Sequence, residues 1–188
     1  WNISGSVEKR FKEGFWFKSA YSHGVAKNPI DPGSIARGSW TANQISGDPN
    51  NYGLSFAANS PGHRFFTVGA YSRDFFKFGT TTVSLFWESR TNGNASYTFS
   101  ADANGDTATL NDLIYIPRNT SEMYLQAYSI TTPIAATFTA QQQADAWEAF
   151  INQDPYLSQH RGEYAVRNAV FLPLVHRADF AVSQDVKI

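Results

Sequence analysis

The sequence predicts an all-β fold: about five strands of an antiparallel, up-and-down transmembrane β-barrel, with long outer loops, one of which contains a short helix. Three kinds of observation lead to this prediction. Apolar and polar residues alternate with a period of two in several separate runs, as they do along β-strands. The connections between these runs are short and long in turn. Finally, 15% of the residues are aromatic and only 16% are charged, which suits β-structure whose large faces are not in contact with water.

The first two runs cover residues 1–11 and 15–26 and are separated by a short turn at 12–14. In the first run, the two sides are Trp1, Ile3, Gly5 and Val7 against Asn2, Ser4, Ser6 and Glu8. In the second, they are Phe15, Phe17, Ser19 and Tyr21 against Trp16, Lys18, Ala20 and Ser22. Because a period of two places successive side chains on opposite faces, each run predicts a strand with two distinct faces.

Three further runs cover residues 63–73, 80–89 and 177–188. In the 80–89 run, Val83, Leu85 and Trp87 share one face, and Ser84, Phe86 and Glu88 share the other. In the last run, the sides are Ala178, Phe180, Val182, Val186 and Ile188 against Asp179, Ala181, Ser183, Asp185 and Lys187, with Gln184 interrupting the apolar side. Each run has about the 9–11 residues that a tilted strand needs to cross a bilayer. We therefore expect the face with Leu85 to contact lipid and the face with Ser84 to line a lumen.

The connections between the five runs alternate in length. Residues 12–14 and 74–79 form short turns, whereas residues 25–62 and 91–176 form long loops. In outer-membrane barrels, short periplasmic turns alternate with long outer loops. Full charges also stand within the polar strand faces, at Glu88, Asp179 and Asp185. A dry core would accept such charges only at high cost, whereas a water-filled lumen accepts them readily.

The second long loop is expected to contain a helix over residues 140–153. Thr139 and Gln142 have the spacing of a capping box, in which each side chain bonds to the backbone N–H of the other residue. Pro155 ends the helix. We expect its apolar stripe to pack against another part of the loop rather than to contact a ligand. The stripe consists of Ala144, Trp147, Phe150 and Ile151.

Composition excludes several classes of function. The formal charge is -1, without any cluster of lysine or arginine, so nucleic acid is not an expected partner. The chain has no cysteine, which excludes disulfides, thiolate zinc sites and cysteine catalysis. No run approaches the roughly 18 apolar residues that a membrane helix needs. The 4 histidines lack the spacing of zinc hydrolases, and motifs of serine hydrolases and nucleotide-binding enzymes are absent, so no enzymatic activity is expected.

The stretch DANGDTATLND contains four side chains that offer hard oxygen ligands, namely Asp102, Asn104, Asp106 and Asp112. The alternation of the first three resembles the start of a calcium loop. The EF-hand pattern fails, because the positions that require glycine and glutamate hold other residues. Two interpretations remain open: a calcium site of another type formed by these four residues, or an Asx-rich turn whose side chains bond to their own backbone.

Two further groups of loop residues are candidates for a role. A dense polar cluster follows the predicted helix and is expected to tie the loop to the barrel rim; it comprises Arg161, Glu163, Arg167 and Asn168. Aromatic residues of the loops can stack on a ligand, and the candidates for this contact are Trp40, Tyr97 and Tyr124.

Several of these stretches together resemble a known family. They are DANGD, then NDLIYIPRN at 111–119, DPYLSQHRGEYAVRN at 154–168 and LPLVHRADFAVSQD at 172–185. Their combination is similar to the outer-loop-and-strand signature of the TonB-dependent receptors of Bacteroidota, in particular the Oar-like group. The resemblance covers residues 100–188 and extends more loosely over residues 1–99.

The resemblance implies a plugged barrel of about 22 antiparallel strands in the bacterial outer membrane. This chain, 1–188, is then expected to be an internal piece without the plug domain and the C-terminal strands. Such receptors bind and import a large nutrient or other ligand without chemistry. The implied partners are membrane lipid and the TonB–ExbB–ExbD system acting through the absent parts. The related nutrient-uptake receptors also have a lipoprotein lid, and whether this protein has one is left open by the resemblance.

A soluble β-sandwich that binds carbohydrate or another ligand is the alternative, with Trp40, Trp87 or Tyr97 as stacking platforms. The parent reading frame distinguishes the two hypotheses. A receptor requires several hundred further residues on both sides, beginning with a signal peptide and a plug.

Overall fold

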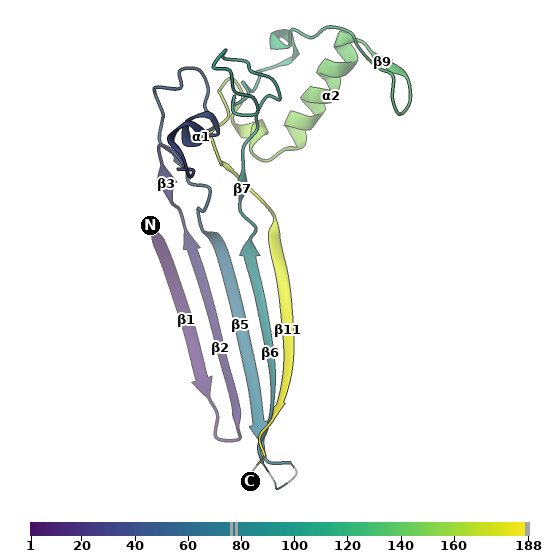
Figure 1. The fold of residues 1–188 in the computed structure, drawn as a ribbon. Helices are drawn as coiled ribbons and strands as arrows, with labels where there is room; N and C mark the ends of the chain where they lie inside the picture. The colour runs from purple at the N-terminus through teal and green to yellow at the C-terminus, as the bar shows by residue number, and fades with distance from the viewer. Residues whose placement is uncertain (76, 78, 187–188) are drawn as a thin grey trace. The chain divides into compact units, whose positions relative to one another are not determined.

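The five predicted runs form one antiparallel sheet in the computed structural model, which describes residues 1–75, 77 and 79–186. The strands are β1 (Asn2–Arg10), β2 (Phe15–Gly24), β5 (Gly62–Arg73), β6 (Thr81–Thr91) and β11 (Leu174–Gln184). They lie side by side in the order β1-β2-β5-β6-β11 (Figure 1). The predicted mostly-β, antiparallel fold is confirmed. Within the described residues the sheet is open, with β1 and β11 as its edges.

The strand boundaries differ from the predicted ones mainly in β11. This strand begins at Leu174 rather than at residue 177, because it pairs with β6 from Leu174 and Thr91 onward. It ends at Gln184, and the predicted Lys187 and Ile188 lie outside the described residues, as do positions 76 and 78 of the second short turn. Both long connections leave from the same end of the sheet, as the alternation of loop lengths predicted.

The register divides the sheet into two faces of different chemistry. Residues paired across antiparallel strands point to the same side. One row on the first face is Val7, Ser19, Thr67, Trp87 and Ala178, and the next is Lys9, Phe17, Gly69, Leu85 and Phe180. On the opposite face the corresponding rows are Glu8, Lys18, Val68, Phe86 and Asp179, and Ser6, Ala20, Phe66, Glu88 and Arg177. We refer to these as the apolar face and the charged face.

Aromatic and histidine rings gather at both ends of the apolar face. The turn-end row of rings consists of Phe11, Phe15 and Tyr71. The loop-end row of rings is broader, extends over several pairing positions, and consists of Trp1, Tyr21, His23, His63, Phe65, Trp87 and His176. The rings touch within each row: Phe11 and Phe15 have centroids 5.5 Å apart, and His23 and His63 stack at 4.1 Å. Between the two rows, this face carries the set Lys9, Phe17, Gly69, Leu85 and Phe180, which is apolar apart from the lysine.

The charged face carries ion pairs along the strands. Glu8 lies 3.5 Å from Lys18 and accepts a hydrogen bond of 2.9 Å from the Trp16 indole. Arg64 donates to Glu88 at 2.7 Å between β5 and β6. Of the three charges that the sequence placed on this side, Glu88 pairs with Arg64 and Asp179 lies 2.8 Å from Arg177, whereas Asp185 follows the end of β11.

The chain divides into two compact units. The sheet unit comprises Trp1–Asn28, Phe56–Ala95 and the described residues of Phe171–Ile188, and the loop unit comprises Pro29–Ser55 and Ser96–Val170. Short strands complete the β-structure: β3 (Lys27–Asn28), β4 (Ser55–Phe56), β7 (Asn94–Ala95), β8 (Tyr128–Ile130), β9 (Ala136–Phe138) and β10 (Val170–Phe171). The helices are α1 (Ala36–Thr41), α2 (Ala140–Gln153) and two 3-10 turns at Thr120–Glu122 and Leu157–Gln159. None of the described helices is long and apolar enough to cross a membrane.

Helix α2 has the predicted bounds and the predicted cap. The Thr139 hydroxyl accepts from the Gln142 N–H at 3.2 Å, and the Gln142 side chain accepts from the Thr139 N–H at 2.9 Å. Two first-turn donors that a helix leaves unpaired are thereby satisfied. Of the predicted apolar stripe, Ala144 and Ile151 are buried. Trp147 packs against the core and stacks at 5.4 Å on the exposed ring of Phe150.

The core of the loop unit forms around the stretch NDLIYIP. Its buried side chains are Leu113, Ile114, Ile116, Ile151, Leu157 and Ala165. The backbone of this stretch pairs with three different segments, through bridges between Ile45 and Asp112, Thr98 and Leu113, and Tyr115 and Tyr164. This central stretch therefore holds together parts of the loop unit that are far apart in the sequence.

Candidate functional site

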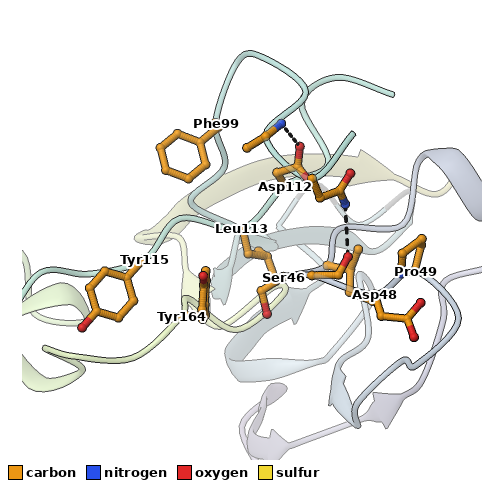
Figure 2. Close-up of a pocket in the computed structure, with 12 residues that line it drawn as sticks. Ser46, Asp48, Pro49, Phe99, Asp112, Leu113, Tyr115 and Tyr164 are labelled. Carbon is orange, nitrogen blue, oxygen red and sulfur yellow. Dashed lines mark hydrogen bonds between the residues drawn. The ribbon is translucent and has the colours of Figure 1, made fainter. Parts of the chain in front are cut away.

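A cavity of about 610 Å³ lies in the loop unit, beside the central stretch (Figure 2). Its volume falls in the range of small-molecule pockets. It is lined by Ile45, Ser46, Gly47, Asp48, Pro49, Phe99, Ala103, Asn104, Asp112, Leu113, Tyr115 and Tyr164. The lining combines aromatic rings with carboxylates, and it contains neither lysine nor arginine.

Backbone pairing brings these residues together. The N–H of Ile45 donates to the Asn111 carbonyl at 2.8 Å, and the N–H of Leu113 donates to the Ile45 carbonyl at 2.9 Å. On the other side of the central stretch, the Phe99 N–H donates to the Asp112 carbonyl at 2.8 Å. Because both segments pair with residues 111–113, these bonds hold the turn that contains Asp48 and the segment that carries Phe99 next to the same part of the central stretch.

Three rings form the aromatic part of the lining. Tyr115 and Tyr164 meet edge to face with centroids 5.4 Å apart, and Phe99 stands nearby (Figure 2). Tyr164 is 55% exposed and Phe99 is 44% exposed, so both rings are open to a ligand. Burial raises the pKa of Tyr115, and its hydrogen bond to Glu122 adds to the effect.

Two carboxylates form the acidic part of the lining. Asp48 is exposed and accepts from the N–H of Asn50 at 2.8 Å. Asp112 is only 3% exposed, and its Oδ2 accepts from the Ala103 N–H at 2.7 Å. The second oxygen of Asp112, Oδ1, is buried and accepts no hydrogen bond from the described residues. A buried carboxylate with one oxygen unsatisfied is costly unless a donor or a cation compensates it.

The four predicted metal ligands lie close together, but most of their oxygens are committed to backbone amides. Asp102 accepts from the N–H groups of Gly105 at 2.7 Å, Asp106 at 3.2 Å and Thr107 at 2.9 Å. Asn104 accepts from the Asp106 N–H at 2.9 Å. These are the contacts of an Asx-rich turn, the alternative that the sequence left open.

Asp106 is engaged in the same way. It accepts from the Ala108 N–H at 2.8 Å and from the Asn111 side chain at 2.9 Å. The Ala108 N–H chiefly holds the pKa of Asp106 below its usual value. The described residues contain no group of three His, Cys, Asp or Glu side chains arranged to hold a metal ion. This arrangement favours the turn, and calcium binding by these residues stays a prediction.

The predicted polar cluster makes contacts within the loop unit. Arg161 forms a two-pronged pair with Glu148 at 2.7 and 3.1 Å, and it also donates to the carbonyl of Pro117 at 3.1 Å. Arg161 thereby ties α2 to the last residue of the central stretch. The backbone carbonyl of Glu163 accepts from Ile116 at 2.8 Å.

Arg167 and Asn168 connect the two sequence stretches of the loop unit. Arg167 is buried and donates to the Asn43 side chain and, at 3.1 Å, to the Pro29 carbonyl. Asn168 donates to Asp31 at 2.9 Å. All these contacts are structural, which agrees with the structural role that we expected for the cluster. The expected contact between this cluster and the barrel rim stays a prediction.

The three aromatic candidates for ligand contact do not line the cavity. Trp40 lies on α1 and packs edge to face on Tyr52. Tyr97 packs against the core and donates its hydroxyl to Asp154, which is a structural role. Tyr124 is 95% exposed. Sequence reasoning missed the lining residues Asp48, Phe99, Tyr115 and Tyr164. The only signals were that Tyr115 belongs to the quoted stretch NDLIYIPRN and Tyr164 to the quoted stretch DPYLSQHRGEYAVRN.

Comparisons of the chain with protein-family models, with curated proteins and with solved structures found no match. The function therefore has to be argued from the two faces of the sheet and from the cavity.

Proposed function

We propose that this chain is part of an outer-membrane TonB-dependent transporter, in which the five-stranded sheet is a section of the barrel wall and the loop unit captures ligand without chemistry. The observation that carries the proposal is the apolar face with a row of rings at each end. Aromatic residues at the two membrane–water interfaces flank the lipid-facing band of such barrels. The proposed lumen side is the charged face, where ion pairs such as Arg64 and Glu88 would stand in water.

The spacing of the two rows suits a bilayer. Trp1 and Phe11 flank β1, are the outermost rings of the two rows on this segment, and are ten residues apart. At a rise of about 3.3 Å per residue this is about 33 Å along the strand. A strand tilted by about 40° would then cover about 25 Å of membrane thickness, which is the height of the apolar band in outer-membrane barrels.

The soluble sandwich is less well supported. A sandwich needs a second sheet to cover the apolar face of the first. Apart from the five-stranded sheet, the described chain contains only two-stranded sheets, and the strands of these have two or three residues each. Sheets of that size cannot cover strands of 9–12 residues.

Under this proposal the implied partners interact with the whole parent protein, of which this chain is one part. Membrane lipid contacts the apolar face, and the TonB–ExbB–ExbD system acts through a plug that is not in this chain. A lipoprotein lid would cover the loop unit. The cavity and its rings give the loop unit a capacity to bind ligand, and no catalytic arrangement is needed.

Single cysteines test the membrane assignment directly, because the chain has no cysteine of its own. The variants Leu85→Cys and Ser84→Cys place one thiol on each face of β6 in the parent protein. After labelling with an environment-sensitive dye in lipid vesicles, nitroxide lipids should quench the label at position 85 and an aqueous quencher should quench the label at position 84. Phe180→Cys and Ala181→Cys on β11 provide a matched second pair. Equal quenching at paired positions would refute the proposal.

A further inference from the structure

Charge is distributed unevenly between the two units. The loop unit contains ten acidic side chains, four arginines and no lysine, a formal charge of -6. The sheet unit has eleven basic and six acidic side chains. The overall charge of -1 is therefore the sum of an acidic loop unit and a basic sheet unit. An excess of one sign attracts ligands of the opposite sign and speeds their association.

The arginines of the loop unit are mostly engaged away from the cavity. Arg118 pairs with Glu122 at 3.1 Å and Arg161 with Glu148 at 2.7 Å, while Arg167 lies 3.8 Å from Asp31. None of the four arginines lines the cavity. Its carboxylates, Asp48 and the buried Asp112, therefore face no positive side chain across the lining.

The carboxylates and aromatic rings of the cavity lining indicate which class of ligand the cavity can bind. An anion would meet two carboxylates and no cationic group. A bare metal ion would need a cage of oxygens, but those of Asp102, Asn104 and Asp106 are largely occupied by backbone N–H groups and by the Asn111 side chain. An ammonium group needs only a few acceptors, and it also binds over aromatic faces. An apolar stem behind the ammonium would pack on the rings and aliphatic atoms of the lining.

We propose that this cavity binds a primary ammonium group on an unbranched apolar stem, the chemistry of a lysine side chain in a peptide or protein ligand. The inference rests on the proposed capture role of the loop unit and names its ligand class. Asp112 supplies the charge for the ammonium. Tyr164 supplies an exposed ring face, and the carboxylate of Asp48 stands at the exposed edge.

The test uses two probes that differ only in the charged group. N-acetyl-lysine methylamide carries the ammonium, and N-acetyl-norleucine methylamide carries the same stem without it. Both are titrated into the full chain in detergent micelles, with binding followed by ligand-observed NMR and calorimetry. The lysine probe should bind at least about tenfold more tightly, since a hydrogen-bonded charge is worth that much. Its affinity should fall as salt is raised, while that of the norleucine probe should not.

Variants assign the effect to the cavity. Asp112→Asn keeps an oxygen for the Ala103 N–H but removes the charge, and it should abolish the preference for the lysine probe. Asp145→Asn is the matched control, because it removes an exposed charge of α2 in the same unit, outside the cavity lining. Tyr164→Leu alters an exposed ring and should weaken the lysine probe by about two- to fivefold while sparing the norleucine probe.

Three results would overturn the inference. They are equal binding of the two probes, loss of the preference in Asp145→Asn, or calcium binding that depends on Asp112 and excludes the lysine probe. If Asp112→Asn fails to fold, the Tyr164→Leu result decides alone. Failure here leaves the membrane assignment standing, since cysteine quenching on β6 measures that assignment independently.

Discussion

Asp154, immediately after α2, joins three parts of the loop unit through one side chain. It accepts from the N–H groups of Tyr156 at 2.9 Å and Leu157 at 2.7 Å, and from the hydroxyl of Tyr97. Burial alone would raise the pKa of Asp154, but these hydrogen bonds outweigh it and hold that pKa below its usual value. Burial raises the pKa of Tyr97 to about 12, and its bond to Asp154 acts in the same direction.

This raised pKa predicts a loss of stability at high pH. The tyrosine pKa in the unfolded chain is about 10, so the contribution of Tyr97 is present below pH 10 and is lost as pH rises through about 12. We expect the loop unit to lose about 1–2 kcal/mol over this interval, allowing for partial exposure. Urea denaturation from pH 9 to 12 measures the loss.

Tyr97→Phe is the matched variant for that measurement. It should flatten the pH dependence and remove one late step from the tyrosinate absorbance titration. If the step that disappears lies near pH 10 instead, the hydroxyl is not held in the way described.

At the same scale, sequence analysis located only part of the cavity. It singled out the lining residues Asn104 and Asp112, because acidic and amide residues cluster there. It did not find Asp48, Phe99 or Tyr164, because these lie in irregular segments that have no periodicity. The backbone bridges at Ile45, Thr98 and Tyr115 bring them together, and such pairings leave no pattern in the sequence.

At the scale of elements, what could be predicted is what has a local physical cause. The long strands follow from alternation with a period of two, and α2 follows from a capping box, an apolar stripe and Pro155. Helix α1 has only six residues, and its N-cap residue, Ile35, makes no side-chain hydrogen bond. Its sequence therefore contains no capping signal from which the helix could be predicted. The extension of β11 to Leu174 depends on pairing with β6, which residues 174–176 alone do not specify.

The capping box of α2 yields a prediction for this element. Thr139→Ala removes the acceptor for the Gln142 N–H and should destabilise the helix by about 1 kcal/mol. Hydrogen exchange of the first-turn amides of α2 should speed up about fivefold, the factor that this free energy implies. Thr131→Ala, at an exposed position before the helix, is the control. Unchanged exchange in Thr139→Ala would show that the cap contributes nothing to the helix.

The two faces of β6 yield the second prediction at this scale. In the parent protein in a bilayer, Leu85→Arg should cost about 2–4 kcal/mol if position 85 lies near the midplane, because arginine then replaces an apolar side chain in lipid. Ser84→Arg, one residue away on the charged face, should cost much less. Reversible folding into lipid vesicles measures both free energies. Similar costs at the two positions would contradict the assignment of faces.

At the scale of the whole molecule, the sheet leaves two kinds of surface without a partner among the described residues. The edge strands β1 and β11 have no further strand beside them. On the apolar face, Leu85 is 54% exposed and Phe180 is 68% exposed. Open edges and exposed apolar faces both promote association in water.

The isolated chain is therefore expected not to form a stable monomer in water. Size-exclusion chromatography with light scattering should show aggregates in buffer and a uniform species in detergent micelles, which cover the apolar face. The chain with Leu85→Arg and Phe180→Arg is a useful comparison, since it should aggregate less. A monodisperse monomer of the unaltered chain that melts cooperatively in buffer would count against the membrane proposal.

The loop unit is assembled from two stretches of chain, Pro29–Ser55 and Ser96–Val170, and this has a consequence for inheritance. Contacts such as those of Arg167 with Asn43 and of Asn168 with Asp31 join the two stretches. A recombination event that exchanged either stretch alone would replace only one member of each pair. The buried polar group of the other member would then lack its hydrogen-bond partner. An exchange that covers both stretches must also carry the intervening β5 and β6. The whole loop unit, with its ligand-binding capacity, should therefore pass between genes as one block together with β5 and β6.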